Sequence, residues 1–157
     1  MRWVYKRTIH AVLEFANGAI ITMGTSWDVW QHNHRNMELY GEEGTLPVPD
    51  PNFFGGEVVM TKRQDPVKKL PKWDHPFAVP NQKHSWGMAA NYRTAGLADM
   101  AIAIMEGRPH RCSMELALHA VDVMTSILKA GETGKAVEIR TTCERPEPLG
   151  VAAAKAL

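Results

Sequence analysis

The side chains best suited to chemistry gather in residues 27–35, where aromatic, acidic and imidazole groups follow one another closely. On an extended strand, Asp28, Trp30, His32 and His34 share one face, because side chains alternate with a period of two. Aromatic faces stack on the C–H groups of hydroxylated ligands, while Asp and His side chains bond the hydroxyls. The candidate substrate-binding residues of this stretch are Trp27, Asp28, Trp30 and His32.

Two other interpretations of this stretch remain open. The His-x-His spacing of His32 and His34 supplies two imidazole ligands for a metal, with Asp28 as a carboxylate partner. A third or fourth protein ligand is not evident, so we predict no metal site. In the remaining interpretation the tryptophans pack in a core or an interface, and the histidines form local hydrogen bonds.

Two further residues stand at positions where function and packing compete. Tyr92 precedes the first expected helix, where its hydroxyl either points at a ligand or caps the core; we include it among the substrate-binding candidates. His119 lies beside an expected buried stripe, near Glu115 and Asp122. We predict a structural role for this histidine rather than a catalytic one.

The sequence lacks the motifs that hold a cofactor or activate a nucleophile. No Gly-x-Gly-x-x-Gly pattern follows a strand and opens a helix. The segment 131–135 resembles a phosphate loop only superficially, because no Ser or Thr follows its lysine and it ends a helix instead of opening one. No serine or cysteine sits in a nucleophile elbow. We therefore predict no catalytic and no cofactor-binding residue in this chain.

Composition excludes several classes of protein. The 157 residues carry 18 basic and 17 acidic side chains, so no global field favours nucleic acid or a membrane surface. No apolar run approaches the ~20 residues of a membrane-spanning helix, and the first residues lack the apolar core of a signal peptide. With two cysteines, Cys112 and Cys143, expected to be reduced thiols, we predict a soluble, cytoplasmic, single-domain protein.

The first half of the chain reads as β-structure. We expect strands over 8–16 and 19–30, joined by a tight two-residue turn at Asn17-Gly18 with both residues at positive φ. Shorter strands follow over 35–40, 45–48 and 57–62. Residues 63–90 show little periodicity and contain several prolines, which predicts a long surface excursion.

The second half reads as helical. Apolar residues recur at helical spacing from Leu97 to Met105, with Gly107 as the stop, and Ser113 fits the N-cap of a second helix. That helix should bury a stripe of apolar residues and end between Gly131 and Gly134. We expect a closing strand over 136–140 and a frayed tail over 150–157.

This order of elements predicts an α+β fold: an open, mostly antiparallel β-sheet with helices packed on one face. The other face of the sheet would carry Met23, Trp27 and Val29, which is too apolar for water alone. We therefore expect a homo-oligomer, at least a dimer, formed through this open sheet face.

Four stretches occur in the order found in one known family. They are EFANGAI (14–20), ELYGEEGTL (38–46), ELALHAVDVM (115–124) and GKAVEI (134–139). Together they resemble the C-terminal domain of the glucose–fructose oxidoreductase / inositol dehydrogenase family, the Gfo/Idh/MocA group. The resemblance covers roughly residues 8–149.

The resemblance implies a two-domain, NAD- or NADP-dependent oxidoreductase that acts on sugars, cyclitols or related polyols. Residues 1–149 would be its substrate-binding and oligomerisation domain, and the Rossmann domain would be absent from the chain. The family's catalytic lysine, aspartate and histidine precede the hairpin seen here and have no counterparts to carry over. Trp27 and Asp28 match a strand position, and Tyr92 a pre-helix position, from which family members often touch substrate.

Two functions from different classes follow. In the first, the chain is the C-terminal half of a sugar or polyol dehydrogenase, supplies substrate contacts and subunit assembly, and binds no cofactor and has no activity alone. In the second, it is a free-standing, non-catalytic module that binds carbohydrate or assists assembly.

Overall fold

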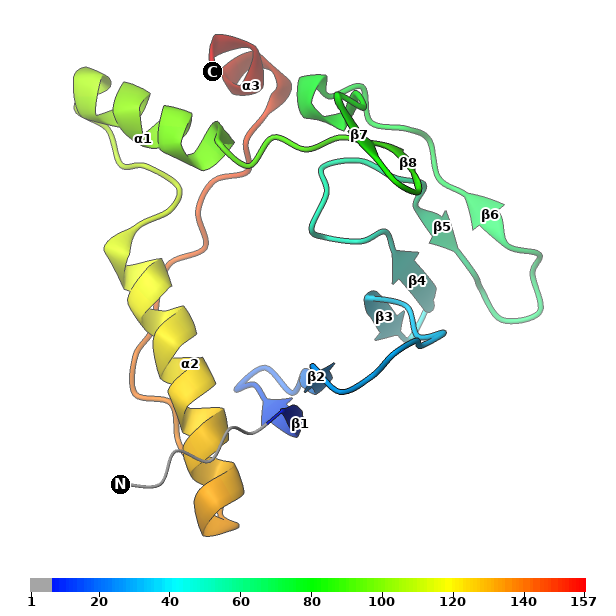
Figure 1. Ribbon diagram of the computed structural model, residues 1–157, viewed down its shortest axis with the longest axis vertical. Coiled ribbons are helices and arrows are strands. Elements are labelled where there is room, and N and C mark those ends of the chain that lie inside the picture. The colour runs from blue at the N-terminus through cyan, green and yellow to red at the C-terminus, as the bar shows by residue number, and fades with distance from the viewer. Residues whose placement is uncertain (1–6) are drawn as a thin grey trace. The chain divides into compact units, whose positions relative to one another are not determined.

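The computed structural model describes residues 7–157, so the first residues, considered above for a signal peptide, lie outside the described part. The chain divides into two compact units: residues 1–34 with 123–138, and residues 35–122 with 139–157. We call them unit 1 and unit 2. Strands occupy the first half of the chain and helices the second, so the predicted α+β class is confirmed (Figure 1).

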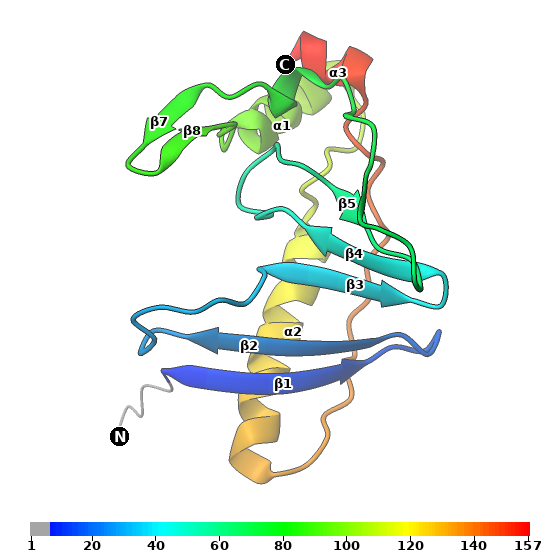
Figure 2. The same ribbon diagram turned by 90° about the vertical axis from the view of Figure 1, so that its right-hand side faces the viewer.

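Unit 1 is built on one β-hairpin, drawn as two opposed arrows in Figure 2. Strand β1 (Thr8–Glu14) pairs antiparallel with β2 (Ile20–Ser26). Ile9, Ala11 and Leu13 are half-buried, whereas the residues between them are exposed, as the alternation predicts. The unit also contains the C-terminal part of helix α2 (Met114–Thr133).

The turn of this hairpin lies where we predicted it but has another geometry. The Phe15 amide donates to the Ala19 carbonyl and the Gly18 amide to the Phe15 carbonyl, each over 2.9 Å, so three residues form the loop. Gly18 has a φ of 86°, and Asn17 is not among the positive-φ residues. This is the pattern of a turn followed by one left-handed glycine. The predicted pair of positive-φ residues was wrong, because the Asn17 side chain accepts from the Ala19 amide instead.

The second strand is shorter than predicted. It ends at Ser26, whose hydroxyl lies 2.7 Å from that of Thr8 at the end of the ladder. The Ser26 hydroxyl also accepts from the Asp28 amide over 3.1 Å, which bends the chain out of the strand. Residues 27–34 therefore form a loop, and the expected strand face of Asp28, Trp30, His32 and His34 does not form.

Unit 2 contains three more antiparallel pairs. Strands β3 (Met37–Gly41) and β4 (Gly44–Val48) form the first, β5 (Val59–Met60) and β6 (Lys68–Lys69) the second, and β7 (Gln82–His84) and β8 (Gly87–Ala89) the third. A single bridge between Thr45 and Thr61 joins the first two pairs. The sheet is open and antiparallel as predicted, but it is divided into two-stranded pieces. Prolines that follow and interrupt β4 supply no amide to extend its ladder.

The helix boundaries follow the predicted signals. Helix α1 (Ala95–Glu106) stops at Gly107, which has a left-handed φ of 65°. The Ser113 hydroxyl accepts from the Leu116 amide over 3.1 Å, as an N-cap should, and Gly134 ends α2 with a φ of 65°. The predicted apolar stripe of α2 is not a buried one, since Met124 and Leu128 are exposed. None of the helices in residues 7–157 combines the length and apolar character that a membrane crossing requires.

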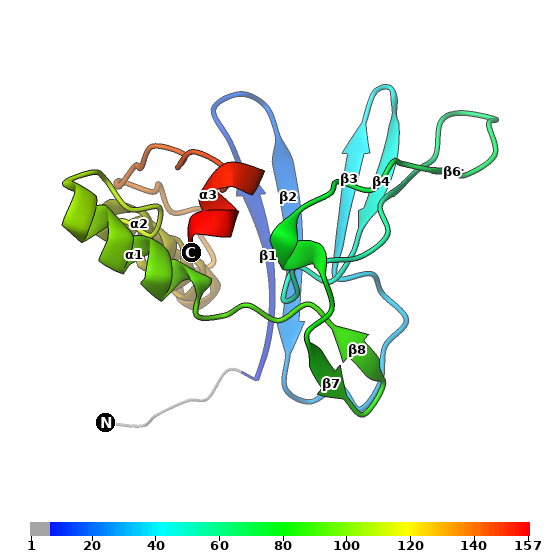
Figure 3. The ribbon, with the colours of Figure 1, turned by 90° about the horizontal axis from the view of Figure 1, so that it is seen from above.

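Two predictions for the end of the chain were wrong. Residues 136–140 form no strand; the backbone that follows them is tied to α2 through Thr141 and Asp122. The tail predicted to fray contains helix α3 (Val151–Ala156), which is rich in alanine, the strongest helix former. Figure 3 shows α3 beside α1, and Ala154 is buried there.

The core of unit 2 consists mainly of small residues and one aromatic cluster. Its buried apolar residues are Phe77, Ala89, Ala90, Ala103 and Ala154. Phe77 lies in the short helix η1 (Pro76–Ala78) and stacks on Tyr92, with ring centroids 4.7 Å apart. Next to Phe77, His75 accepts from the Phe77 amide and donates from Nε2 to the Leu149 carbonyl over 2.9 Å. The segment 63–90, predicted to be a surface excursion, thus carries part of the core.

Substitution of Gly44 should destabilise unit 2. A Cβ at this position would lie 2.8 Å from the Thr61 carbonyl oxygen, so Gly44→Ala must push β4 away from the bridge to β5. We expect a loss of about 1–3 kcal/mol in the free energy of unfolding, measured by urea titration. Gly96→Ala is the matched control, because nothing lies within 4 Å of its added methyl group. Equal midpoints for the two variants would contradict the close approach of these strands.

Candidate functional site

The loop that follows β2 presents its aromatic side chains to solvent. Trp27 is 90% exposed and Trp30 is fully exposed. Both ring faces are therefore accessible to a ligand, as the binding interpretation requires, and packing within the described residues does not use them.

Charged and imidazole groups accompany these tryptophans on the same loop. An Oδ1 of Asp28 lies 3.3 Å from a guanidinium nitrogen of Arg7, in an exposed ion pair. The rings of His32 and His34 lie face to face, with centroids 6.2 Å apart. Within residues 7–157 no group of three or more His, Cys, Asp and Glu side chains is arranged to hold a metal ion. The loop offers hydrogen-bonding groups beside open aromatic faces.

Tyr92 belongs to unit 2, whereas the other four candidates belong to unit 1. Its ring packs against Phe77 and lies edge-on to Phe54, and its hydroxyl donates to the Val79 carbonyl over 2.9 Å. The side chain therefore caps the aromatic cluster. Its hydroxyl oxygen can still accept one hydrogen bond from a ligand.

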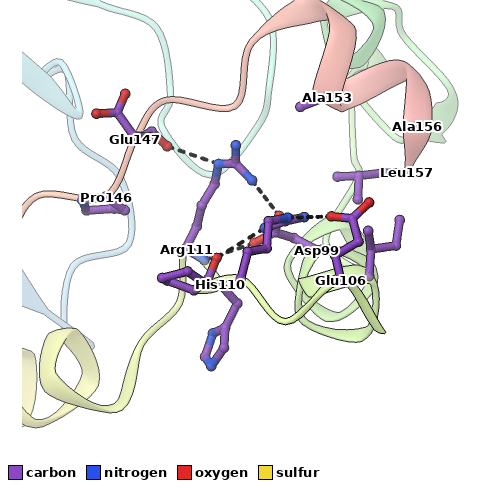
Figure 4. A pocket seen from close by; sticks show the side chains of 12 residues that line it. Asp99, Glu106, His110, Arg111, Pro146, Glu147, Ala153, Ala156 and Leu157 are labelled. Atoms are coloured by element: carbon purple, nitrogen blue, oxygen red, sulfur yellow. Dashed lines mark hydrogen bonds and ion pairs between the residues drawn. The ribbon is translucent and has the colours of Figure 1, made fainter. Parts of the chain in front are cut away.

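The most highly organised polar cluster in unit 2 surrounds Asp99, which the sequence reading did not single out (Figure 4). Asp99 is only 3% exposed, although it lies on α1. Its carboxylate accepts from Arg108 over 3.1 Å, from the Arg111 amide over 2.9 Å, and from the Arg111 guanidinium. Arg111 also donates to the Glu147 carbonyl over 3.0 Å. The sequence did contain a signal for this cluster: Asp99 lies among apolar helix positions, and Arg108 and Arg111 follow it. Because a buried charge must be paired, this pattern indicates a buried ion pair.

The surroundings of Asp99 decide its charge. Burial acts to raise the pKa of Asp99, but the Arg111 amide and the two guanidinium groups together hold this pKa below its usual value. A hydrogen bond to Glu106 in turn raises the pKa of Arg108. Asp99 is thus ionised at neutral pH, and its carboxylate faces the guanidinium groups of Arg108 and Arg111.

A cavity of about 420 Å³ adjoins this cluster, between the end of α1 and α3. Its lining includes Asp99, Arg108, His110 and apolar residues of α3 such as Ala153 and Ala156. The volume suits a small molecule. However, Asp99, Glu106 and backbone carbonyls already take up donors of Arg108 and Arg111, so the cluster serves mainly to join the end of α1 to the C-terminal segment.

His119 takes part in a second polar link. The Thr141 hydroxyl donates to Asp122 over 2.8 Å, so His119 Nδ1 donates to the Thr141 oxygen over 3.0 Å. The Thr141 amide also donates to Asp122, over 3.2 Å. These contacts hold the segment after α2 against the helix, which agrees with the structural role predicted for His119.

The strand arrangement of the described residues differs from that of a dinucleotide-binding site. Such sites lie at the ends of parallel strands, where a glycine-rich turn leads into a helix. The paired strands of residues 7–157 are antiparallel, and α2 begins at a serine cap after a loop.

Removal of the Asp99 charge should destabilise unit 2 in a pH-dependent way. Because the pKa of Asp99 is lowered on folding, its ionised form contributes stability above the unfolded-state pKa, and this contribution is lost as the pH falls through the folded-state pKa. We expect Asp99→Asn to unfold about 3 kcal/mol more easily at neutral pH. The difference from the unsubstituted chain should shrink in acid.

Urea titrations at neutral and acidic pH test this expectation. Asp65→Asn is a suitable control, because Asp65 is an exposed carboxylate in the turn between β5 and β6. A pH-independent loss of stability in Asp99→Asn would show that shape, and not charge, matters at this position.

Comparison with known proteins bears on the N-terminal part of the chain. Residues 5–47 match the family model of the GFO/IDH/MocA C-terminal domain. No curated protein and no solved structure gives a match. The resemblance to the C-terminal domain of the Gfo/Idh/MocA oxidoreductase family is therefore confirmed by the segment that carries β1, β2, the loop after them and most of the β3–β4 pair.

Proposed function

We propose that this chain is the substrate-contacting and assembly part of a cytoplasmic, NAD(P)-dependent oxidoreductase that acts on sugars or polyols. The observation that carries the proposal is the family match over residues 5–47. The matched segment contains the complete loop with the two most exposed tryptophans of the described chain. Two free cysteines, Cys112 and Cys143, agree with a reducing compartment.

In this function the loop recognises a hydroxylated ring. Trp27 and Trp30 offer open faces for its C–H groups, while Asp28 and His32 supply an acceptor and an imidazole for its hydroxyls. The Arg7 guanidinium donates to the Asp28 carboxylate over 3.3 Å and orients it. Tyr92, which belongs to unit 2, is a separate candidate contact that would offer its hydroxyl oxygen to a substrate as an acceptor.

The nicotinamide cofactor would accept and release the hydride. Residues other than those described here would hold this cofactor. What the described residues contribute is binding and orientation of the substrate. Because no catalytic acid or base is evident in this chain, the isolated chain should bind substrate without transforming it.

We also propose that the hairpin of unit 1 takes part in assembly. The outward side does not carry the predicted residues, because Met23 lies opposite the half-buried Ala11, and Trp27 and Val29 lie in the loop after β2. It carries Val12 and Ile20 instead, which are 64% and 67% exposed. A small sheet with apolar groups on its outer face gains free energy when a second copy covers them. The partner would be another copy of this chain.

The loop residues can be tested by binding. The purified chain should bind myo-inositol or D-glucose, seen as shifts of the indole N–H signals of Trp27 and Trp30 in nuclear magnetic resonance spectra. We expect Trp27→Ala or Trp30→Ala to weaken this binding roughly tenfold, because each removes a stacking face. Tyr92→Phe should have a smaller effect, because it removes one acceptor for the ligand and the hydrogen bond to the Val79 carbonyl but keeps the ring. Unchanged affinity in all three variants would remove these residues from the site.

The same preparation tests whether the chain is inactive alone. With NAD or NADP and a panel of polyols, we expect no formation of reduced cofactor above the protein-free control. A rate of cofactor reduction that increases with the concentration of the chain would contradict the proposal that the isolated chain binds substrate without transforming it.

Assembly can be tested by light scattering coupled to size exclusion. We expect a mass of at least a dimer at micromolar concentration, and a shift towards the monomer in Val12→Asp, where a charge opposes contact. Glu14→Asp is the control, since it lies on the same strand face and keeps its charge. A monomeric mass for the unsubstituted chain would contradict the proposal.

A further inference from the structure

The turn of the β1–β2 hairpin places an asparagine directly before a glycine. Asparagine is among the thermolabile residues of proteins, and of the six asparagines in this chain only Asn17 precedes glycine. Asn17 and Gly18 are both exposed, and nothing lies within 4 Å of the position that a Gly18 Cβ would take. Because glycine has no side chain, its backbone nitrogen can approach the carboxamide of the preceding residue without hindrance.

Two hydrogen bonds restrain this pair in the closed turn. The Gly18 amide donates to the Phe15 carbonyl over 2.9 Å, so its proton is engaged. The Asn17 side-chain oxygen accepts from the Ala19 amide over 3.0 Å, which keeps the carboxamide turned towards Ala19. Both bonds must break before the Gly18 nitrogen can attack the carboxamide carbon. A two-stranded ladder is only marginally stable, so local opening of the turn is the step that releases them.

We propose that Asn17 is a site of non-enzymatic deamidation whose rate is set by the opening of the hairpin turn. In the open turn, the Gly18 nitrogen loses its proton and bonds to the carboxamide carbon of Asn17, and ammonia leaves. The cyclic imide that forms then takes up one water, which breaks one or the other of its two ring C–N bonds. The products are aspartate and isoaspartate at position 17. The reaction consumes water and releases ammonia, and it requires no oxidant, cofactor or enzyme.

The two products differ in their effect on the hairpin. Aspartate keeps an acceptor for the Ala19 amide but adds a negative charge to the turn that follows Glu14. Isoaspartate lengthens the main chain by one carbon atom, so the loop no longer fits the pairing of Glu14 with Ile20. The modification therefore changes the charge of the turn in both products and the register of β1 and β2 in one. It concerns unit 1 alone and does not depend on the proposed substrate.

The test compares the folded chain with a peptide of residues 14–20 during incubation at neutral and mildly alkaline pH. Mass spectrometry locates the conversion of amide to acid, and a methyltransferase specific for isoaspartate measures that product. We expect Asn17 to react before the other asparagines, at a rate that rises with pH because an amide proton must be lost. The folded chain should react at least about tenfold more slowly than the peptide. Asn17→Gln is the control, because its longer side chain would have to close a larger ring.

A pair of alanine variants tests the role of turn opening. Leu13→Ala removes a half-buried side chain of β1 close to the turn, whereas Val67→Ala removes an exposed one from the turn between β5 and β6 in unit 2. The chemistry is slow, so its rate follows the population of the open turn. We expect Leu13→Ala to react about fivefold faster than the unsubstituted chain, and Val67→Ala to react at an unchanged rate.

Three outcomes would overturn the inference. Conversion of another asparagine before Asn17 would reject the site, and equal rates in the folded chain and the peptide would reject the restraint by the turn. Equal rates in the two alanine variants would also reject that restraint. Circular dichroism shows whether Leu13→Ala remains folded; if it does not, its rate should equal that of the peptide, and a slower rate contradicts the proposal.

Discussion

The buried carboxylate of Asp99 is the interaction on which unit 2 depends most. An ionised group at 3% exposure is costly to remove from water, and only the converging donors of Arg108 and Arg111 offset that cost. Those donors come from the connection between α1 and α2, and Arg111 extends the link to the Glu147 carbonyl. The Asp99 carboxylate thus joins α1 to the α1–α2 connection and, through Arg111, to the C-terminal segment.

Around this point the unit is held by directional contacts more than by a large apolar core. Its buried residues are mostly alanines, and no side chain of the described residues is both large and fully buried. His75 ties distant segments together through one hydrogen bond and Thr141 through several, and such bonds are each worth only about 1 kcal/mol. Such a fold leaves aromatic side chains such as Trp86 exposed at its surface.

The exposed aromatic side chains of this protein lie in two different settings. On the loop after β2, Trp27 and Trp30 are open and unsupported by other rings, so a ligand must order them as it binds. In the β7–β8 hairpin, by contrast, the Trp86 ring already packs against Phe53 and His84. The loop after β2 lies in the segment that matches the family model, whereas Trp86 lies outside that segment.

Local signals in the sequence determined the features that depend on neighbouring residues. The glycine after α1, the Ser113 cap and the alternation of Ile9, Ala11 and Leu13 all act over a few residues, and each was confirmed. The end of β2 at Ser26 and the burial of Asp99 were missed, because each depends on a contact with another segment of the chain, with Thr8 and with Arg111 respectively. Backbone propensity is a local property, whereas the pairing of a buried charge or a strand end is decided only by tertiary contacts.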